Sequence, residues 1–270
     1  MNVVLFFSLV AALVQPPKNI VMVDDEVHPV TAGRWTKEVT SHDVRSVTYV
    51  KKLGIVDSKH ENGSRDYVIW VPDSAADGAV GIIWFHGHHG FSPRTFKKRI
   101  LNQFVPHVGK NFFVVIPEMP WSYNTSTRTK RNGRIWQKPG EFVSFIKQVE
   151  AHMGYAAGIE VIDWRVVGHS AGGSTIATLG KTGDLCKIGA SRVVWSDSSY
   201  GTWLDTAYGG CMREYAHRSD VFVTTWGPPQ RRAKNFVKRY KGANVKMHIR
   251  KGGHTFIGDN IVNLSGLLED

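Results

Sequence analysis

The chain has 270 residues, of which 42% are hydrophobic and 11% aromatic. This is enough apolar material for a substantial core, and it excludes a chain that is disordered throughout. The length fits one large α/β domain better than two small ones. The formal net charge of +11 favours anionic partners and says little about the fold.

The N-terminal segment 3–14 is almost continuously apolar and is interrupted only by Ser8. It is too short to span a bilayer and has the length of the apolar region of a signal peptide. We therefore expect a signal peptide over 1–15 and a single domain over 16–270. The mature chain is then secreted or extracytoplasmic, with no transmembrane segment. The alternative is that the segment forms a buried first strand.

Eight segments have the composition of β-strands, because they are short, rich in β-branched or aromatic residues and bounded by turn residues. In chain order they are 44–50, 67–71, 80–85, 112–117, 164–167, 192–195, 221–226 and 245–249. The first two are expected to be antiparallel neighbours. The segments at 80–85 and 112–117 are almost wholly apolar, which is typical of strands buried on both faces of a parallel sheet.

Helical patterns fall between most of these strands. The expected helices are 94–104, 141–153, 175–179, 232–240 and 261–268. In the second of these, Phe142, Phe145, Ile146 and Val149 recur at helical spacing on one face. Strands that alternate with helices predict a mostly parallel sheet with right-handed crossovers.

Residues 168–172 read Gly-His-Ser-Ala-Gly, and they lie between an expected strand and an expected helix. In this context Gly-x-Ser-x-Gly indicates a nucleophile elbow, a sharp turn that exposes the hydroxyl of Ser170. The helix that follows points its free N–H groups at the site. The alternative is a tight strand-to-helix turn that happens to contain a serine.

A serine nucleophile needs a histidine that takes its proton, and in this chain order the histidine comes last. His254 is the best candidate, because it lies in a Gly-rich segment directly after the final expected strand. His248 lies inside that strand and His217 precedes the strand at 221–226, so both are less well placed. The alternative for His254 is a structural role in the loop.

The histidine also needs an acid that orients it. Asp197 immediately follows the strand at 192–195, where the carboxyl ends of parallel strands gather catalytic groups. Asp205, Asp220 and Asp259 are the other candidates. The alternative for Asp197 is that it stabilises a turn or caps a helix.

An oxyanion hole requires two backbone N–H donors. We expect one at Ala171, directly after the nucleophile, and one at His88 or His89 in the segment 86–90, which reads His-Gly-His-His-Gly. Three histidines so close together also suggest a metal site. No second cluster with ligand spacing accompanies them, so we expect neither a metal nor a cofactor.

Other features bear on the substrate and on the compartment. Cys186 and Cys211 either form one disulfide, which would staple a loop over the site, or remain free thiols. Basic residues concentrate in 128–134 and 231–251, and they favour an anionic substrate or simply form a solvated face. A nucleic-acid partner is not expected. A stacking rim could be formed by four aromatic residues, Trp121, Trp136, Trp203 and Tyr208.

Three motifs together resemble the α/β-hydrolase superfamily of serine esterases, lipases and peptidases. They are Phe85-His86-Gly87 before a Gly-containing loop, the elbow at 168–172, and Gly253-His254 near the end. The likeness covers about residue 67 to the C-terminus. It implies an eight-stranded, mostly parallel sheet with helices on both faces. The acid usual after the seventh strand is absent, but some members carry it after the sixth, which matches Asp197.

These observations predict a serine hydrolase that cleaves an ester through an acyl-enzyme, with Ser170, His254 and Asp197 as its triad. The substrate is then a small-molecule or polymeric acyl compound. One alternative is a peptidase or amidase that acts on a charged polymer. The other is a catalytically silent protein that retains the fold and binds a polyanion through its basic face.

Overall fold

The computed structural model describes most of the chain after residue 33. The described residues are 34–39, 45–52, 66–72, 74–88, 95, 99–117, 119, 121–124, 129–132, 136–215, 218–225, 227–240 and 244–269. The expected signal peptide at 1–15, His89, His217 and part of the basic segment 128–134 lie outside them.

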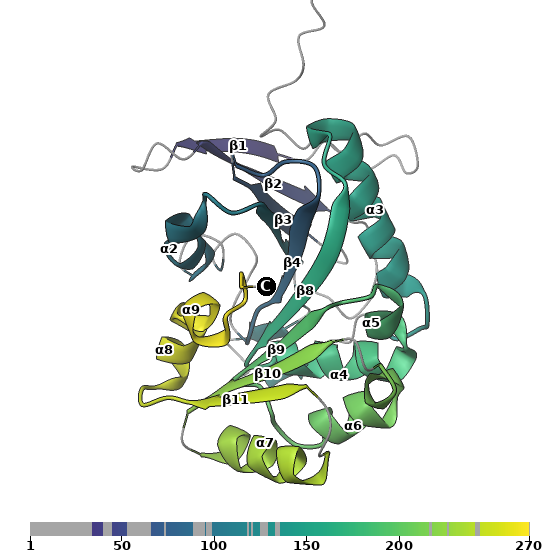
Figure 1. Cartoon of the computed structure of the whole chain (residues 1–270), viewed down its shortest axis with the longest axis vertical. Helices are drawn as coiled ribbons and strands as arrows, with labels where there is room; N and C mark the ends of the chain where they lie inside the picture. The colour runs from purple at the N-terminus through teal and green to yellow at the C-terminus, as the bar shows by residue number, and fades with distance from the viewer. Residues whose placement is uncertain are drawn as a thin grey trace, which may run out of the picture.

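A twisted sheet of nine strands runs through the described part of the chain (Figure 1). Its spatial order is β1-β2-β3-β5-β4-β8-β9-β10-β11. The strands are β1 (Arg34–Val39), β2 (Arg45–Lys52), β3 (Asp66–Val71), β4 (Ala79–Phe85), β5 (Phe112–Pro117), β8 (Val161–His169), β9 (Arg192–Ser196), β10 (Ser219–Thr224) and β11 (Val245–Ile249). A separate antiparallel pair is formed by β6 (Trp121–Asn124) and β7 (Thr129–Asn132).

The strand directions confirm a mostly parallel sheet. The strands from β5 to β11 along the sheet pair in parallel, whereas β1–β2, β2–β3 and β3–β5 are antiparallel. The expected antiparallel pairing of the first two predicted strands is confirmed by β2 and β3. The expected number of eight strands was wrong, because β1 adds a strand at the edge. Its sequence, Arg-Trp-Thr-Lys-Glu-Val, does not alternate clearly. It pairs with β2 in antiparallel register.

Helices cover both faces of the sheet, as expected (Figure 1). One face carries α3 (Glu141–Ala157), α4 (Gly172–Thr182), α5 (Asp184–Lys187), α6 (Trp203–Gly209) and α7 (Pro228–Arg239). The other face carries α2 (Leu101–Phe104), α8 (His254–Asp259) and α9 (Ile261–Ser265). Short 3-10 helices occur at η2 (Val105–His107) and η3 (Cys211–Arg213). No helix in the described ranges is both long enough and apolar enough to cross a bilayer.

Each face of the sheet has its own apolar core, which explains the unbroken apolar run in β4. Ile82 and Trp84 point to the core that contains Phe104 of α2. Ile83 and Phe85 point to the core that contains Phe142 of α3. Each large apolar side chain removed from water contributes roughly 1.5–3 kcal/mol, so the two cores packed on the central strands contribute strongly to stability.

Two of the four aromatic residues expected at a stacking rim are buried instead. Trp136 is 3% exposed, and its ring lies 4.7 Å from that of Phe142. Tyr208 is 1% exposed and packs against Phe236 of α7. Trp203 is partly buried against the same core. The rim expectation is therefore wrong for Trp136 and Tyr208, because the α-helices that pack on this face cover both rings.

Cys186 of α5 and Cys211 of η3 form a disulfide. Both elements pack against α4. Gly210, just before Cys211, lies against Gly180 near the C-terminal end of that helix. The nucleophile elbow precedes the N-terminal end, so the bridge lies about one helix length away, roughly 16 Å. The expectation that the disulfide staples a loop over the site was therefore wrong.

Candidate active site

The site lies at the carboxyl ends of the central parallel strands. Because β4, β8, β9, β10 and β11 run in the same direction, the residues that follow them gather at one edge of the sheet. Those residues are Gly87, Ser170, Asp197, Thr225 and His254.

Ser170 occupies a strained turn between β8 and α4. Its φ angle is 55°, which is unusual for a residue with a Cβ and costs on the order of 1–3 kcal/mol. The turn is held in place because the Ser170 N–H donates a 3.0 Å hydrogen bond to the carbonyl of Ser196 in β9. A Cβ on Gly172 would lie 2.2 Å from the carbonyl oxygen of Phe85, so a side chain cannot replace this glycine. These features are those of the nucleophile elbow that the sequence predicts.

Asp197 lies in a second strained turn, directly after β9. Its φ angle is 45°, and its N–H donates to the carbonyl of Val223 at 2.7 Å. The carboxylate accepts hydrogen bonds from the N–H of Thr225 at 3.1 Å and from its hydroxyl at 3.2 Å. The side chain is 2% exposed. The structure thus presents a buried carboxylate at the site edge, oriented by neighbouring β10.

His254 begins α8 and meets Asp197 directly. The Nδ1 atom of His254 lies 2.5 Å from Oδ2 of Asp197. Since the carboxylate accepts, Nδ1 carries the hydrogen and Nε2 is left as the basic nitrogen. Burial by itself raises the pKa of Asp197, but the hydrogen bonds from His254 and Thr225 outweigh it and hold that pKa below its usual value. Asp197 is therefore ionised at neutral pH.

The side chain of His254 is 40% exposed, so the ring is partly open to solvent. Within the described part of the chain, no hydrogen bond joins it to the hydroxyl of Ser170. Such bonds are often long in unliganded sites and tighten when substrate binds.

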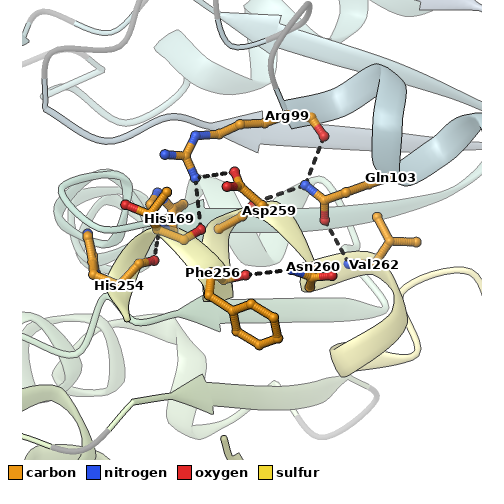
Figure 2. A network of polar contacts seen from close by, with 10 residues as sticks. Arg99, Gln103, His169, His254, Phe256, Asp259, Asn260 and Val262 are labelled. Atoms are coloured by element: carbon orange, nitrogen blue, oxygen red, sulfur yellow. Dashed lines mark hydrogen bonds and ion pairs between the residues drawn. The ribbon is translucent and has the colours of Figure 1, made fainter. Parts of the chain in front are cut away.

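His169 lies between the elbow and α8, and no role was expected for it from the sequence. Its ring stacks on that of His254 with centroids 4.7 Å apart and planes at 28°. Its Nε2 lies 3.3 Å from the carbonyl oxygen of His254, as Figure 2 shows, so Nε2–H is the donor. Burial, His254 and Arg99 lower the pKa of His169 to about 3. The only signal in the sequence was its position directly before the nucleophile.

The loop after β4 lies against the nucleophile. A Cβ on Gly87 would lie 2.7 Å from the Cβ of Ser170. No described residue accepts a hydrogen bond from the N–H of Ala171, the residue before α4. Of the two expected loop donors, His88 is half-buried and His89 lies outside the described residues. Of the expected oxyanion donors, the N–H of Ala171 is thus the one that lies next to Ser170 without an acceptor among the described residues.

His86 has a structural role, because both of its ring nitrogens bind the backbone. Its Nδ1–H donates to the carbonyl of Gly87 at 2.9 Å, and its Nε2 accepts from the N–H of Met119 at 3.1 Å. Both ring nitrogens are thus bound to the protein, and they hold the loop in shape. Among the residues with described positions, no three His, Cys, Asp or Glu side chains form a group suited to a metal ion.

The other candidates for the acid are bound elsewhere. Asp205 pairs with Arg239 at 2.8 Å, Asp220 with Arg218 at 3.0 Å, and Asp259 with Arg99 at 2.9 Å. Asp220 also lies at the amino end of β10, whereas the site lies at the carboxyl ends of the strands. His248 lies within β11 at the edge of the sheet. Of the predicted acids, the structure brings only Asp197 to His254.

No family model matches the sequence, and neither does any curated protein. Solved structures are nevertheless similar in fold. An S-formylglutathione hydrolase from Agrobacterium tumefaciens is 11% identical, with a TM-score of 0.51 over 86% of this chain and 98% of that chain. The S-formylglutathione hydrolase FrmB from Staphylococcus aureus is 10% identical, with a TM-score of 0.54 over 83% of this chain and 99% of that chain.

A third structure, the fluorophosphonate-binding serine hydrolase FphF from Staphylococcus aureus, is 10% identical, with a TM-score of 0.52 over 83% of this chain and 99% of that chain. At such identities the likeness concerns the fold alone. The chain has the α/β-hydrolase fold, with its mostly parallel sheet and its elbow between strand and helix.

Proposed function

We propose that this protein is a serine hydrolase that cleaves a carboxylic ester through an acyl-enzyme. Ser170 is the nucleophile, His254 the general base and then the general acid, and Asp197 the acid that orients His254. The observation that carries the proposal is the 2.5 Å contact between Asp197 and His254 at the sheet edge where the strained elbow presents Ser170.

The geometry supports the following steps. Nε2 of His254 takes the proton of the Ser170 hydroxyl while Oγ attacks the acyl carbon and the carbonyl electrons move onto oxygen. The Ala171 N–H and an N–H of His88 or His89 bind this oxyanion. The C–O bond to the alcohol then breaks, and the alcohol takes the proton from His254. Water, deprotonated by His254, hydrolyses the acyl-enzyme and restores Ser170.

Asp197 acts by its charge and by its hydrogen bond. It keeps the hydrogen of His254 on Nδ1 and stabilises the imidazolium that forms when Nε2 is protonated. Ser170, the nucleophile, and Asp197, which orients His254, both lie in strained turns. Strain of this kind is typical of active sites, because the surrounding structure has to maintain it.

We infer an ester substrate because an alcohol is an easier leaving group than an amine. A thioester belongs in the same test, since two of the similar structures are S-formylglutathione hydrolases. The chemistry requires no cofactor. We also propose a preference for anionic substrates. The net charge of +11 supports it, as do the exposed Arg231 and Arg232 of α7.

The test is labelling with a fluorophosphonate probe, followed by hydrolysis of p-nitrophenyl esters from acetate to long acyl chains and of a thioester. We expect labelling and turnover in the wild type and neither in Ser170→Ala. Ser144→Ala is the matched control, because Ser144 is an exposed serine on α3, and it should behave as the wild type.

The outcomes separate the rival functions. A folded wild type that is not labelled would contradict the proposal and favour a polyanion-binding protein, whose affinity should fall steeply with salt. Labelling without turnover of any ester would favour a peptidase or amidase. Labelling that persists in Ser170→Ala would place the nucleophile elsewhere.

We also propose that the protein is exported. The disulfide between Cys186 and Cys211 supports this, since such bonds persist in oxidising compartments. Expression of the full chain in a secreting host should yield extracellular protein, and N-terminal sequencing should show that residues 1–15 have been removed. Protein that stays inside the cell with its first residues intact would contradict the proposal.

A further inference from the structure

The position of His254 depends on a very short helix. His254 is the first of the six residues of α8, and Gly253 precedes it. A helix of one to two turns is not stable by itself in water. The direction of the His254 imidazole therefore depends on what holds α8 against the rest of the protein, and Figure 2 shows these contacts.

Gln103 of α2 binds the end of α8 and the start of α9. Its Nε2 donates to the carbonyl of Gly258 at 2.9 Å, and its Oε1 accepts from the N–H of Val262 at 3.2 Å. Nε2 also donates to the carbonyl of Arg99 at 2.9 Å, within its own segment. The side chain is 5% exposed. One buried amide thus fixes both sides of the turn between the two helices.

Arg99, just before α2, provides the second contact. Its Nη1 pairs with Asp259 at 2.9 Å and lies 3.5 Å from the carbonyl oxygen of Thr255. The ion pair is partly exposed, with 26% and 41% of the two side chains accessible. Pairs of this kind are worth little for stability. Arg99 therefore contributes more to the placement of α8 than to its folding.

His169 provides the third contact, and it touches His254 itself. It supports the ring by stacking and the backbone by the hydrogen bond to the His254 carbonyl. Gly258 of α8 packs closely against His169 and Arg99. A Cβ there would lie 2.5 Å from Nε2 of His169 and 2.1 Å from Nη1 of Arg99. The buried ring of His169 is thus enclosed between the elbow and α8.

We propose that His169 is a positioning residue that, together with Gln103 and Arg99, holds the His254 imidazole in line between Asp197 and Ser170. The proposal rests on the proposed function of the same site. His169 is one residue from the nucleophile in the chain, and it contacts the base in space. His169 therefore fixes the position of α8 relative to the elbow.

The chemistry requires that this ring stay neutral. His169 faces His254 and Arg99, which both lower its pKa, and the opposing effect of Asp197 is smaller. A proton on His169 would repel the imidazolium that His254 becomes during the reaction. With Nε2–H donated to a carbonyl, the ring supports His254 without competing for the proton that Ser170 releases.

The experiment uses three substitutions of His169 that remove different parts of its side chain. His169→Ala removes the ring and the donor, His169→Phe keeps a ring, and His169→Gln keeps a donor near the position of Nε2. We expect kcat to fall roughly 10- to 100-fold in His169→Ala, with little change in KM, since misplacement of a catalytic group by about 1 Å has this effect. The other two variants should recover part of kcat.

A second measurement does not depend on activity. The hydrogen between His254 Nδ1 and Asp197 should give a downfield proton resonance in the wild type, and it should be lost or exchange faster in His169→Ala. Gly258→Ala displaces the same ring from the α8 side and should act in the same direction. If the wild type neither reacts with the probe nor turns over esters, the proposed function fails, and this resonance alone decides the inference.

Arg99→Gln has a matched control in Arg239→Gln. Both substitutions break an Arg–Asp pair of similar length, but that of Arg239 lies between α6 and α7. We expect kcat to fall only in Arg99→Gln. Unchanged kcat and an unchanged resonance in both His169→Ala and Gly258→Ala would overturn the inference. It would also be overturned by a rise in KM with intact kcat, because His169 would then shape substrate binding.

Discussion

Asp197 directly follows β9 and Asp220 lies in β10, the neighbouring parallel strand, and both are almost fully buried. They lie at opposite ends. Asp197 follows the carboxyl end of β9, whereas Asp220 is the second residue of β10 at its amino end. The same residue type, at similar burial, has two different environments.

The partners of the two carboxylates differ in what they can do. Asp220 binds Nε and Nη2 of Arg218 at 3.0 Å and accepts from the hydroxyl of Tyr208. Arg218 is 5% exposed, Tyr208 is 1% exposed, and burial raises the pKa of Asp220. Asp197 instead binds the imidazole of His254, whose side chain is 40% exposed and whose Nε2 is left without a hydrogen.

This difference fits the proposed function, in which only the Asp197 cluster takes part in acid–base chemistry. The Asp220 cluster is closed, and its cation does not release a proton at neutral pH. The Asp197 cluster ends at the partly exposed imidazole of His254, which stacks on His169, the residue before Ser170. The contrast predicts that substitutions at Asp197 change rate and that substitutions at Asp220 change stability.

The largest effect is expected for Asp197→Asn. Without the carboxylate, His254 is no longer kept in the tautomer with a basic Nε2, and kcat should fall by about 10⁴-fold. Ester hydrolysis by the purified variant measures this, with circular dichroism to show that it is folded. If the folded variant retained full turnover, the orienting acid would have to be a different residue.

Asp220→Asn should have the opposite outcome. It leaves the guanidinium of Arg218 buried without its counter-charge, which costs about 3–5 kcal/mol in the free energy of unfolding. Urea denaturation measures this loss, and kcat/KM of the folded variant should equal that of the wild type. A large loss of kcat in the folded variant would mean that the two ends of the sheet are coupled.

Cys186→Ala should lower the free energy of unfolding by about 3 kcal/mol, because the disulfide closes a loop between residues 25 apart. The bond lies at the far end of α4 from Ser170, so turnover at a temperature where the variant is folded should not change. Denaturation with and without reductant measures the first effect, and the variant should be insensitive to reductant. A loss of turnover in the folded variant would contradict this and would show that the disulfide helps to position the active-site residues.

The smallest effect is a pH dependence that arises from His169. Its pKa of about 3 in the folded protein lies below the ordinary 6.5. The unfolded chain therefore binds a proton between these pH values that the folded chain does not, so this contribution is complete above pH 6.5 and is lost as the pH falls toward 3. Between pH 7 and pH 5, the wild type should lose about 2 kcal/mol more of its free energy of unfolding than His169→Phe.

Denaturation at the two pH values measures this difference. Equal losses in the wild type and in His169→Phe would show that His169 is protonated in the folded protein, in disagreement with a neutral ring beneath His254.

The buried parts of the fold could be predicted closely from the sequence. The segments expected at 80–85 and 112–117 coincide closely with the buried strands β4 and β5, and the elbow serine lies where expected between β8 and α4. Apolar runs identify strands that are buried on both faces, because few other structures bury every side chain. The local turn at Ser170 is determined by its glycines and by its flanking elements.

The failures share one cause, which is that the deciding contacts are distant in sequence. β1 has no clear pattern in the sequence, and it pairs with β2, a strand that the sequence does predict. Trp136 and Tyr208 look like surface aromatics in the sequence, but packed helices cover both. His254 was expected in a loop, yet it begins α8, which Gln103 holds from α2.

The sequence by itself determined the order of the central strands, the elbow and the position of Ser170, since these depend on residues that are neighbours in the chain. The tertiary structure alone decided which carboxylate meets His254 and which ring lies beneath it. Asp197 and His254 are 57 residues apart, and Gln103 and Gly258 are 155 apart. Such contacts follow from strand order and helix packing, which join the ends of β9 and β11 at one edge of the sheet.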